Sequence, residues 1–96
     1  QGNFKYALEF LDRAQSLREK IGDKRGIANC HNVRGLIHFQ LGEFDQSIKE
    51  QNKGLVIRRE IGHREGVAAS QFNLALVFEK QGNMDKALEL MLLCSH

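Results

Sequence analysis

The chain opens with apolar residues that recur every three or four positions, the spacing that places side chains on one face of an α-helix. Phe44, Ile48, Leu55 and Ile61 repeat this stripe less completely further along the chain. Polar and charged residues fill the positions between, so each segment is predicted to be an amphipathic helix. The members of the first stripe are Phe4, Ala7, Leu8, Leu11, Ala14, Leu17 and Ile21. The whole pattern predicts five helices, over about residues 4–21, 26–41, 43–61, 65–81 and 83–96.

The chain contains no proline, and glycines fall between the predicted helices. Gly22 and Gly62 follow the last apolar residue of a long helix, where glycine adopts a left-handed conformation at little cost and ends the helix. Asp23 precedes the second helix, and its side chain can accept hydrogen bonds from the free amides there. Three more glycines each precede a helix by one residue and are predicted to form tight turns: Gly2, Gly42 and Gly82.

Shifted along itself by forty residues, the sequence matches its own pattern. The shift places Gly2, Phe4, Arg18, Ile21, Gly22, Gly26, Ala28 and Leu36 on Gly42, Phe44, Arg58, Ile61, Gly62, Gly66, Ala68 and Leu76, and a third copy begins at Gln81. Self-similarity of this kind indicates stacked repeats, each burying its apolar face against its neighbours. We expect one domain over residues 1–96, divided into the second helix of an incomplete repeat (1–22), a complete repeat (23–62) and a repeat truncated at its C-terminal end (63–96). Because the chain starts inside a repeat and without methionine, we expect it to be part of a longer protein.

Small residues and a glycine-x-apolar step recur at fixed places in each period, at Gly35, Gly42, Phe44 and Ser47, and again at Ala75, Gly82, Met84 and Ala87. This spacing resembles the tetratricopeptide repeat family, in the forty-residue variety found in spindle-orientation adaptors and bacterial signalling regulators. The resemblance implies an all-α fold in which antiparallel helix hairpins stack into a short right-handed α-solenoid. The sequence departs from the family by placing polar side chains at positions that are usually large and apolar or a tyrosine: Arg34, His38, Gln51 and Gln71.

The resemblance also implies a concave groove, lined by the first helix of each hairpin, that binds a peptide segment or a helix of a partner protein. Amide side chains there could hold the main chain of a peptide, while Phe39 and Phe72 shelter its apolar side chains. The alternative is that both aromatic rings pack under a neighbouring helix and the amides are merely solvated. The predicted partner-binding residues are Asn29, Asn32, Leu36, Phe39, Gln40, Phe72, Leu76, Glu79 and Lys80. Some family members bind a terminal carboxylate with lysine, arginine and asparagine at these places, a pattern that Leu36, Phe72 and Leu76 do not follow.

Charge and composition argue against several other classes of function. The net charge of +2 comes from basic and acidic residues that are interleaved, so no basic stripe suited to nucleic acid is present. No stretch approaches the roughly 20 apolar residues of a membrane span. Two distant cysteines, Cys30 and Cys94, favour free thiols and a cytoplasmic location over a disulfide framework.

No catalytic or metal-binding motif accompanies the repeats, so we expect neither enzymatic activity nor a cofactor. Cys30, His31 and His38 include two potential zinc ligands seven residues apart, but with a cysteine pointing elsewhere they do not complete a tetrahedral site. Arg34 is the least expected residue, because a buried guanidinium needs a partner. It is predicted either to pair with an acid from a neighbouring helix or to reach the edge of the groove.

The final helix is apolar on nearly every side after Glu89, whereas a terminal repeat normally presents a polar outer face. This favours a homo-oligomer, with self-association through Leu90, Met91 and Leu93, and with Phe10 as a further candidate. The leading interpretation is a non-catalytic adaptor or scaffold that binds a protein or peptide, in a signalling context. The alternative is an architectural or oligomerisation segment without an external peptide ligand.

Overall fold

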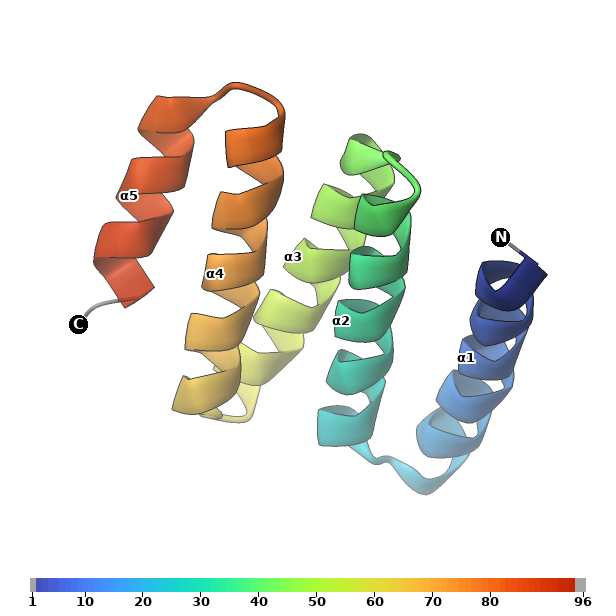
Figure 1. Ribbon diagram of the computed structural model, residues 1–96. Coiled ribbons are helices and arrows are strands. Elements are labelled where there is room, and N and C mark those ends of the chain that lie inside the picture. Colours follow the sequence, from blue (N-terminus) through green and yellow to red (C-terminus); the bar gives the residue numbers. More distant parts are fainter. Residues whose placement is uncertain (1, 95–96) are drawn as a thin grey trace.

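The computed structural model describes residues 2–94, and these residues form five α-helices without any strand (Figure 1). The helices alternate in direction as they succeed one another, which confirms the predicted fold of stacked antiparallel hairpins. Their predicted boundaries differ from the observed ones by one or two residues, and residues 95–96 of the last predicted helix lie outside the described range. The helices are α1 (Gly2–Ile21), α2 (Lys24–Gln40), α3 (Phe44–Glu60), α4 (Arg64–Lys80) and α5 (Met84–Cys94).

Each link between helices contains one glycine in the left-handed region, with φ of 71° at Gly22, 77° at Gly42, 69° at Gly62 and 85° at Gly82. The predicted turn glycines are therefore confirmed, except that Gly2 is the first residue of α1 rather than part of a turn. Asp23 caps α2 as predicted, because its Oδ1 accepts a hydrogen bond of 3.0 Å from the Gly26 N–H.

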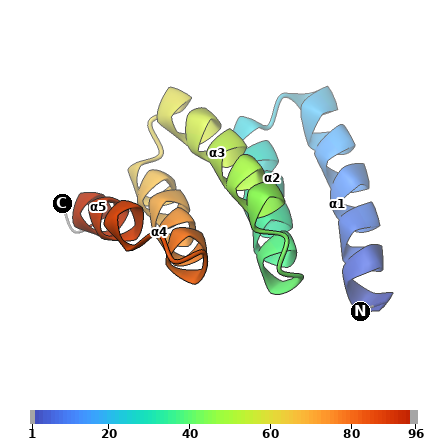
Figure 2. The same cartoon turned by 90° about the horizontal axis from the view of Figure 1, so that it is seen from above.

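Helices that follow one another in the chain also lie next to one another in space (Figure 2). Apart from these sequential pairs, only α2 and α4 contact each other among the described helices. The result is a thin slab of 38 × 34 × 15 Å. This nearest-neighbour packing is typical of repeat solenoids.

Small residues allow the helices to approach closely at the centre of each hairpin. Ala28 and Ala75 are fully buried, and a Cβ at Gly54 would stand 3.2 Å from the Ala28 carbonyl oxygen. The apolar core on the α1 side consists of Leu11, Cys30 and Ile37, with Phe4, Ala7, Leu8 and Ala14 packed against it. On the α5 side the buried apolar residues are Leu74, Ala75, Val77 and Ala87.

One polar departure from the repeat pattern, Gln51, is accommodated by a glycine on the neighbouring helix. Gln51 is fully buried, and its Nε2 donates a 3.1 Å hydrogen bond to the carbonyl oxygen of Asn32. A Cβ on Gly35 would stand only 2.7 Å from the Gln51 Nε2, which is too close for a side chain at position 35. Ser47 donates its hydroxyl to the Gly35 carbonyl oxygen at 2.7 Å. The side chain at position 51 thus fits because its neighbour at position 35 has none.

Candidate functional site

The first helices of the two hairpins, α2 and α4, meet through a hydrogen bond between asparagine side chains. The Nδ2 of Asn73 donates to the Oδ1 of Asn32 at 3.0 Å. Both residues are half-buried, so this contact forms a seam between the helices. We use the term α2/α4 face for the side chains at and beside this seam, which comprise the predicted partner-binding residues together with Val33 and Asn73.

The predicted partner-binding residues differ in their exposure. Leu36 and Phe72 are the large apolar members with exposed side chains, at 39% and 48%. Half-buried members are Asn32, Phe39 and Leu76; the other exposed members are Asn29, Gln40, Glu79 and Lys80. Because α2 and α4 carry these residues at equivalent positions of the repeat, both helices present them on the same side.

Asn29 is held in place by a buried arginine of α3. Arg58 is only 4% exposed, and its Nη2 donates to the Asn29 Oδ1 at 2.9 Å. Its Nη1 donates to the carbonyl oxygen of Gly66 at 3.0 Å and to the Ser70 hydroxyl at 2.9 Å. Burial lowers the pKa of Arg58, and the nearby charge of Arg25 lowers it further. Arg58 therefore ties α2, α3 and α4 together and fixes the orientation of the Asn29 amide.

Phe39 packs partly within the fold. Its ring lies 5.8 Å from the ring of Phe44, centroid to centroid, with an interplanar angle of 53°. This tilted contact across the link between α2 and α3 is a favourable aromatic geometry. Phe39 thus contacts the neighbouring helix α3 through its ring, while Phe72 stays half exposed.

Two members of the α2/α4 face escaped the sequence reasoning. Val33 is 43% exposed beside Asn32, and Asn73 forms the seam described above. Val33 could have been found from its spacing, because it lies three residues before Leu36 and seven before Gln40 on the same side of the helix. The pairing of Asn73 with Asn32 depends on how the two helices are placed, and a linear pattern carries no signal for it.

Arg34 pairs with acids from both neighbouring helices, which decides between the two roles predicted for it. Its Nη1 lies 3.2 Å from the Glu50 Oε1 on α3, and its Nη2 lies 3.1 Å from the Asp12 Oδ1 on α1. His31 donates from Nδ1 to the same Glu50 oxygen at 2.8 Å. These residues line a polar cavity of about 410 Å³ between α1 and the α2–α3 hairpin. Burial alone would raise the pKa of Glu50, but the hydrogen bonds from His31 and Arg34 outweigh it, and the pKa is lowered.

Comparison with known proteins agrees with this architecture. The profile described as tetratricopeptide repeat matches residues 27–92. The chain belongs to the tetratricopeptide repeat family. It is also similar to a protein of Guillardia theta named uncharacterized protein ycf37, with 27% identity over 90 residues. That alignment covers 94% of the chain and 43% of the relative, so the chain spans less than half of the relative's length.

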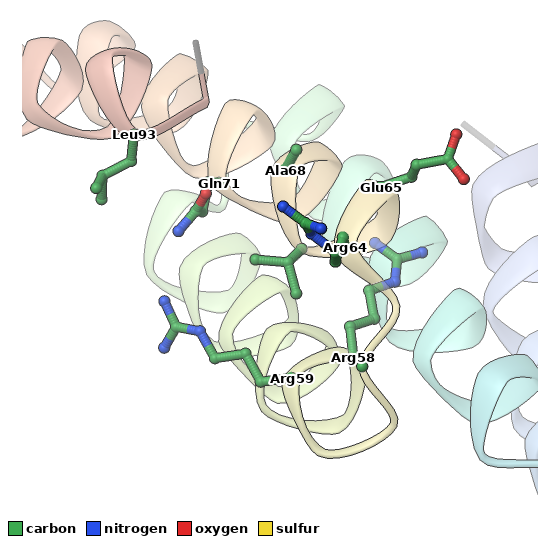
Figure 3. Close-up of a pocket in the computed structure, with 9 residues that line it drawn as sticks. Arg58, Arg59, Arg64, Glu65, Ala68, Gln71 and Leu93 are labelled. Carbon is green, nitrogen blue, oxygen red and sulfur yellow. The ribbon is translucent and has the colours of Figure 1, made fainter. Parts of the chain in front are cut away.

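A second cavity of this tetratricopeptide repeat chain, of about 540 Å³, opens between α3, α4 and α5. Figure 3 shows Arg59 of α3 and Leu93 of α5 extending toward the same space, while the Glu65 carboxylate points to the other side of α4. Val67 and Ala68 contribute apolar surface to the lining. Leu93, which was predicted to take part in self-association, therefore lines this cavity.

The predicted self-association residues of α5 are not equally available. Leu90 and Met91 are half-buried, because they follow the fully buried Ala87 by three and four residues and share its side of the helix. Leu93 is 51% exposed, and the sequence reasoning missed two other exposed leucines of α5, Leu88 at 55% and Leu92 at 64%. The exposed apolar surface of α5 thus consists of Leu88, Leu92 and Leu93 rather than Leu90.

Within residues 2–94, no three histidine, cysteine, aspartate or glutamate side chains are grouped as a metal ion would require. His31 and His38 instead form hydrogen bonds with Glu50 and Glu43, the latter at 2.7 Å between the His38 Nδ1 and the Glu43 Oε1. None of the described helices combines the length and the apolar content needed to cross a lipid bilayer.

Proposed function

We propose that this chain is a non-catalytic protein-interaction module whose α2/α4 face binds a peptide segment or a helix of a partner. Tetratricopeptide repeats generally mediate protein–protein interaction, and the family is generally non-catalytic. The observation that carries the proposal is the exposure of three large apolar side chains on adjacent helices, Val33, Leu36 and Phe72. Apolar side chains gathered on one face and rimmed by polar residues mark an interaction surface.

The internal hydrogen bonds determine what the asparagines on this face can offer a partner. Arginine has only donors, so the Asn29 atom that Arg58 contacts must be the oxygen. The Nδ2 of Asn29 is thereby turned away from Arg58, and the oxygen of Asn32 is already engaged by Asn73. Both asparagines are left to act as donors, which fits recognition of main-chain carbonyl oxygens in an extended segment.

The charged residues at one end of the face set no strong preference for a charged partner. Glu79 and Lys80 carry opposite charges next to each other, and the neighbouring Gln40 is neutral. Selectivity is therefore proposed to come from apolar side chains of the partner that cover Leu36 and Phe72. In this proposal the chain serves as an adaptor or scaffold in a cytoplasmic signalling protein. The free, buried thiol of Cys30 is compatible with a reducing compartment, and the Cys94 side chain lies outside the described ones.

The proposal is tested with a phage-displayed library of random dodecapeptides selected on the purified chain. We expect enriched peptides with apolar residues, and loss of their binding in the double variant Leu36→Asp, Phe72→Asp, by at least about tenfold in Kd. Val56→Asp is the matched control, because Val56 is 56% exposed but lies on α3. Fluorescence anisotropy of a labelled enriched peptide measures its Kd for the unchanged chain, the double variant and the Val56→Asp control.

Two results would contradict the proposal. The library could yield no enriched peptide, in which case the architectural role becomes the better account of the chain. Enriched peptides could also bind the double variant as tightly as the unchanged protein, which would place the interaction on another surface. Circular dichroism of each variant establishes that the helices remain folded.

A further inference from the structure

The most exposed apolar surface within residues 2–94 lies on α1. Ile21 is 78% exposed, Tyr6 73%, Phe10 70% and Leu17 64%. At 100° per residue these four side chains fall within a narrow stripe on one side of the helix. We call them the α1 stripe.

No described helix covers the α1 stripe. Among the helices that the structure describes, α1 contacts only α2, and it does so through a different side, where Leu11 is buried and Phe4, Ala7 and Leu8 pack. Four large apolar side chains aligned along a helix form the kind of surface that proteins cover by association.

The spacing of the stripe reads the same in both directions. The intervals between Tyr6, Phe10, Leu17 and Ile21 are four, seven and four residues. If two copies of α1 run antiparallel about a two-fold axis near Arg13 and Ala14, Tyr6 faces Ile21 of the second copy, and Phe10 faces its Leu17. Each aromatic ring then meets an aliphatic side chain, and every apolar member of the stripe has a partner. Two-fold symmetry requires a surface that complements itself in this manner.

We propose that the chain forms a homodimer through antiparallel packing of the α1 stripes of two copies. Charged residues beside the stripe agree with this arrangement. Glu9 and Lys20 lie on the same edge, so Glu9 of each copy comes near Lys20 of the other, as in antiparallel helix pairs. Arg13 lies on that edge near the axis and meets its own symmetry copy, a repulsion that salt screens. Salt screens the two Glu9–Lys20 attractions as well, so the dimer Kd is expected to depend only weakly on moderate salt.

The area of the stripe suits a weak, specific dimer. Large aromatic side chains bury about 150–250 Å² each. With the exposed fractions given above and complete burial in the dimer, the four side chains amount to about 500 Å² per copy and about 1,000 Å² in total, which reaches the lower limit for a specific interface. Association is accordingly expected in the micromolar range of Kd.

Sedimentation equilibrium of the 96-residue chain from about 5 to about 500 µM measures the average molar mass, and its dependence on concentration gives the dimer Kd. Leu17→Glu should raise the dimer Kd at least about tenfold, because a carboxylate enters the interface from both copies. Leu92→Glu is the matched control, since Leu92 of α5 is also 64% exposed. It should leave the Kd unchanged.

Each other outcome overturns the proposal. A monomer throughout the concentration range means that two copies do not pair through the α1 stripe. Dimers that are lost with Leu92→Glu and kept with Leu17→Glu place the interface on α5. Circular dichroism confirms that both variants retain their helices, as expected for changes at exposed positions.

Cysteine cross-linking tests the antiparallel register. Tyr6→Cys and Ile21→Cys are each introduced into a chain in which Cys30 is alanine and Cys94 is serine, and the two proteins are mixed and oxidised. The mixed disulfide between positions 6 and 21 should dominate, because these positions face each other. Disulfides joining position 6 to position 6 would indicate a parallel pair and contradict the proposed geometry.

Discussion

The link before α2 and the link before α4 carry different residues at the position that directly precedes the helix. In the first, Asp23 caps α2 and its Oδ2 pairs with Arg18 at 2.8 Å. In the second, His63 occupies the equivalent place, and α4 has no side-chain cap. The His63 Nε2 lies 3.1 Å from the Nη2 of Arg25, and because arginine only donates, that nitrogen must accept. The proton of the neutral imidazole is then on Nδ1. That atom and the Nε of Arg58 are buried without a hydrogen-bond partner among the described residues.

Replacing His63 with aspartate should therefore stabilise the chain. The new carboxylate can accept from the Gly66 N–H, as Asp23 does from Gly26, and it offers Arg58 and Arg25 an anionic partner. We expect the free energy of unfolding to rise by about 1 kcal/mol in urea titrations at neutral pH. The reverse change, Asp23→His, is the control and should lower it. An unchanged or lower stability in His63→Asp would show that the second link does not have room for the capping geometry.

At the scale of helices, the cluster around Glu50 joins three elements. Arg34 of α2 reaches Asp12 on α1 and Glu50 on α3, and Lys53 adds a longer contact of 3.7 Å to the second Glu50 oxygen. The side chains of Arg34 and Glu50 are only 12% and 10% exposed, so solvent screens their attraction little. A polar position in the middle of the repeat thus joins α2 to α3 through a largely buried ion pair, and joins α2 to α1 through Asp12, whose side chain is 75% exposed.

This cluster makes the fold sensitive to acid. The pKa of Glu50 is lowered from its ordinary value of 4.5, so the unfolded chain binds a proton at this group more readily than the folded chain. The stability that Glu50 contributes is complete above pH 4.5 and is lost as the pH falls through the lower folded-state pKa. Urea titrations across this range should show a falling free energy of unfolding.

Glu50→Gln should reduce that pH dependence and cost about 2 kcal/mol at neutral pH, since hydrogen bonds to a charged group are replaced by neutral ones. Some pH dependence will remain, because the pKa of Asp23 is also lowered, mainly by the Gly26 N–H and then by Arg18. If the free energy of unfolding of the variant depended on pH as that of the unchanged protein does, the Glu50 carboxylate would not be the source of this pH dependence.

The elements of the fold follow from local chemistry, which explains why sequence reasoning found them. A left-handed glycine follows each of the helices α1 to α4, and apolar spacing marks the buried side, as at Gly22 and Leu11. Contacts between helices carry no such local signal. The Asn32–Asn73 hydrogen bond and the pairing of Arg34 with Asp12 and Glu50 depend on the angle at which one helix lies against the next.

At the scale of the whole molecule, stability is shared unequally along the stack. Among the helices of residues 2–94, α1 contacts only α2, and α5 contacts only α4, whereas α2, α3 and α4 each contact at least two other helices. In a solenoid, the free energy of each helix comes from its nearest neighbours, so the terminal helices open before the centre. The central three are also joined by the Arg58 hydrogen bonds to Asn29, Gly66 and Ser70.

Native-state hydrogen exchange should reveal this order. At low micromolar concentration, amides in α1 and α5 should exchange faster than those in the middle of α2, α3 and α4. If the α1 stripe forms the proposed dimer, raising the concentration slows exchange in α1 and leaves α5 unchanged, because only α1 gains a neighbour. The Leu17→Glu variant serves as the control and should show the fast α1 exchange at every concentration. Equal protection of all five helices would contradict the nearest-neighbour account, since it requires the stack to open as a single cooperative unit.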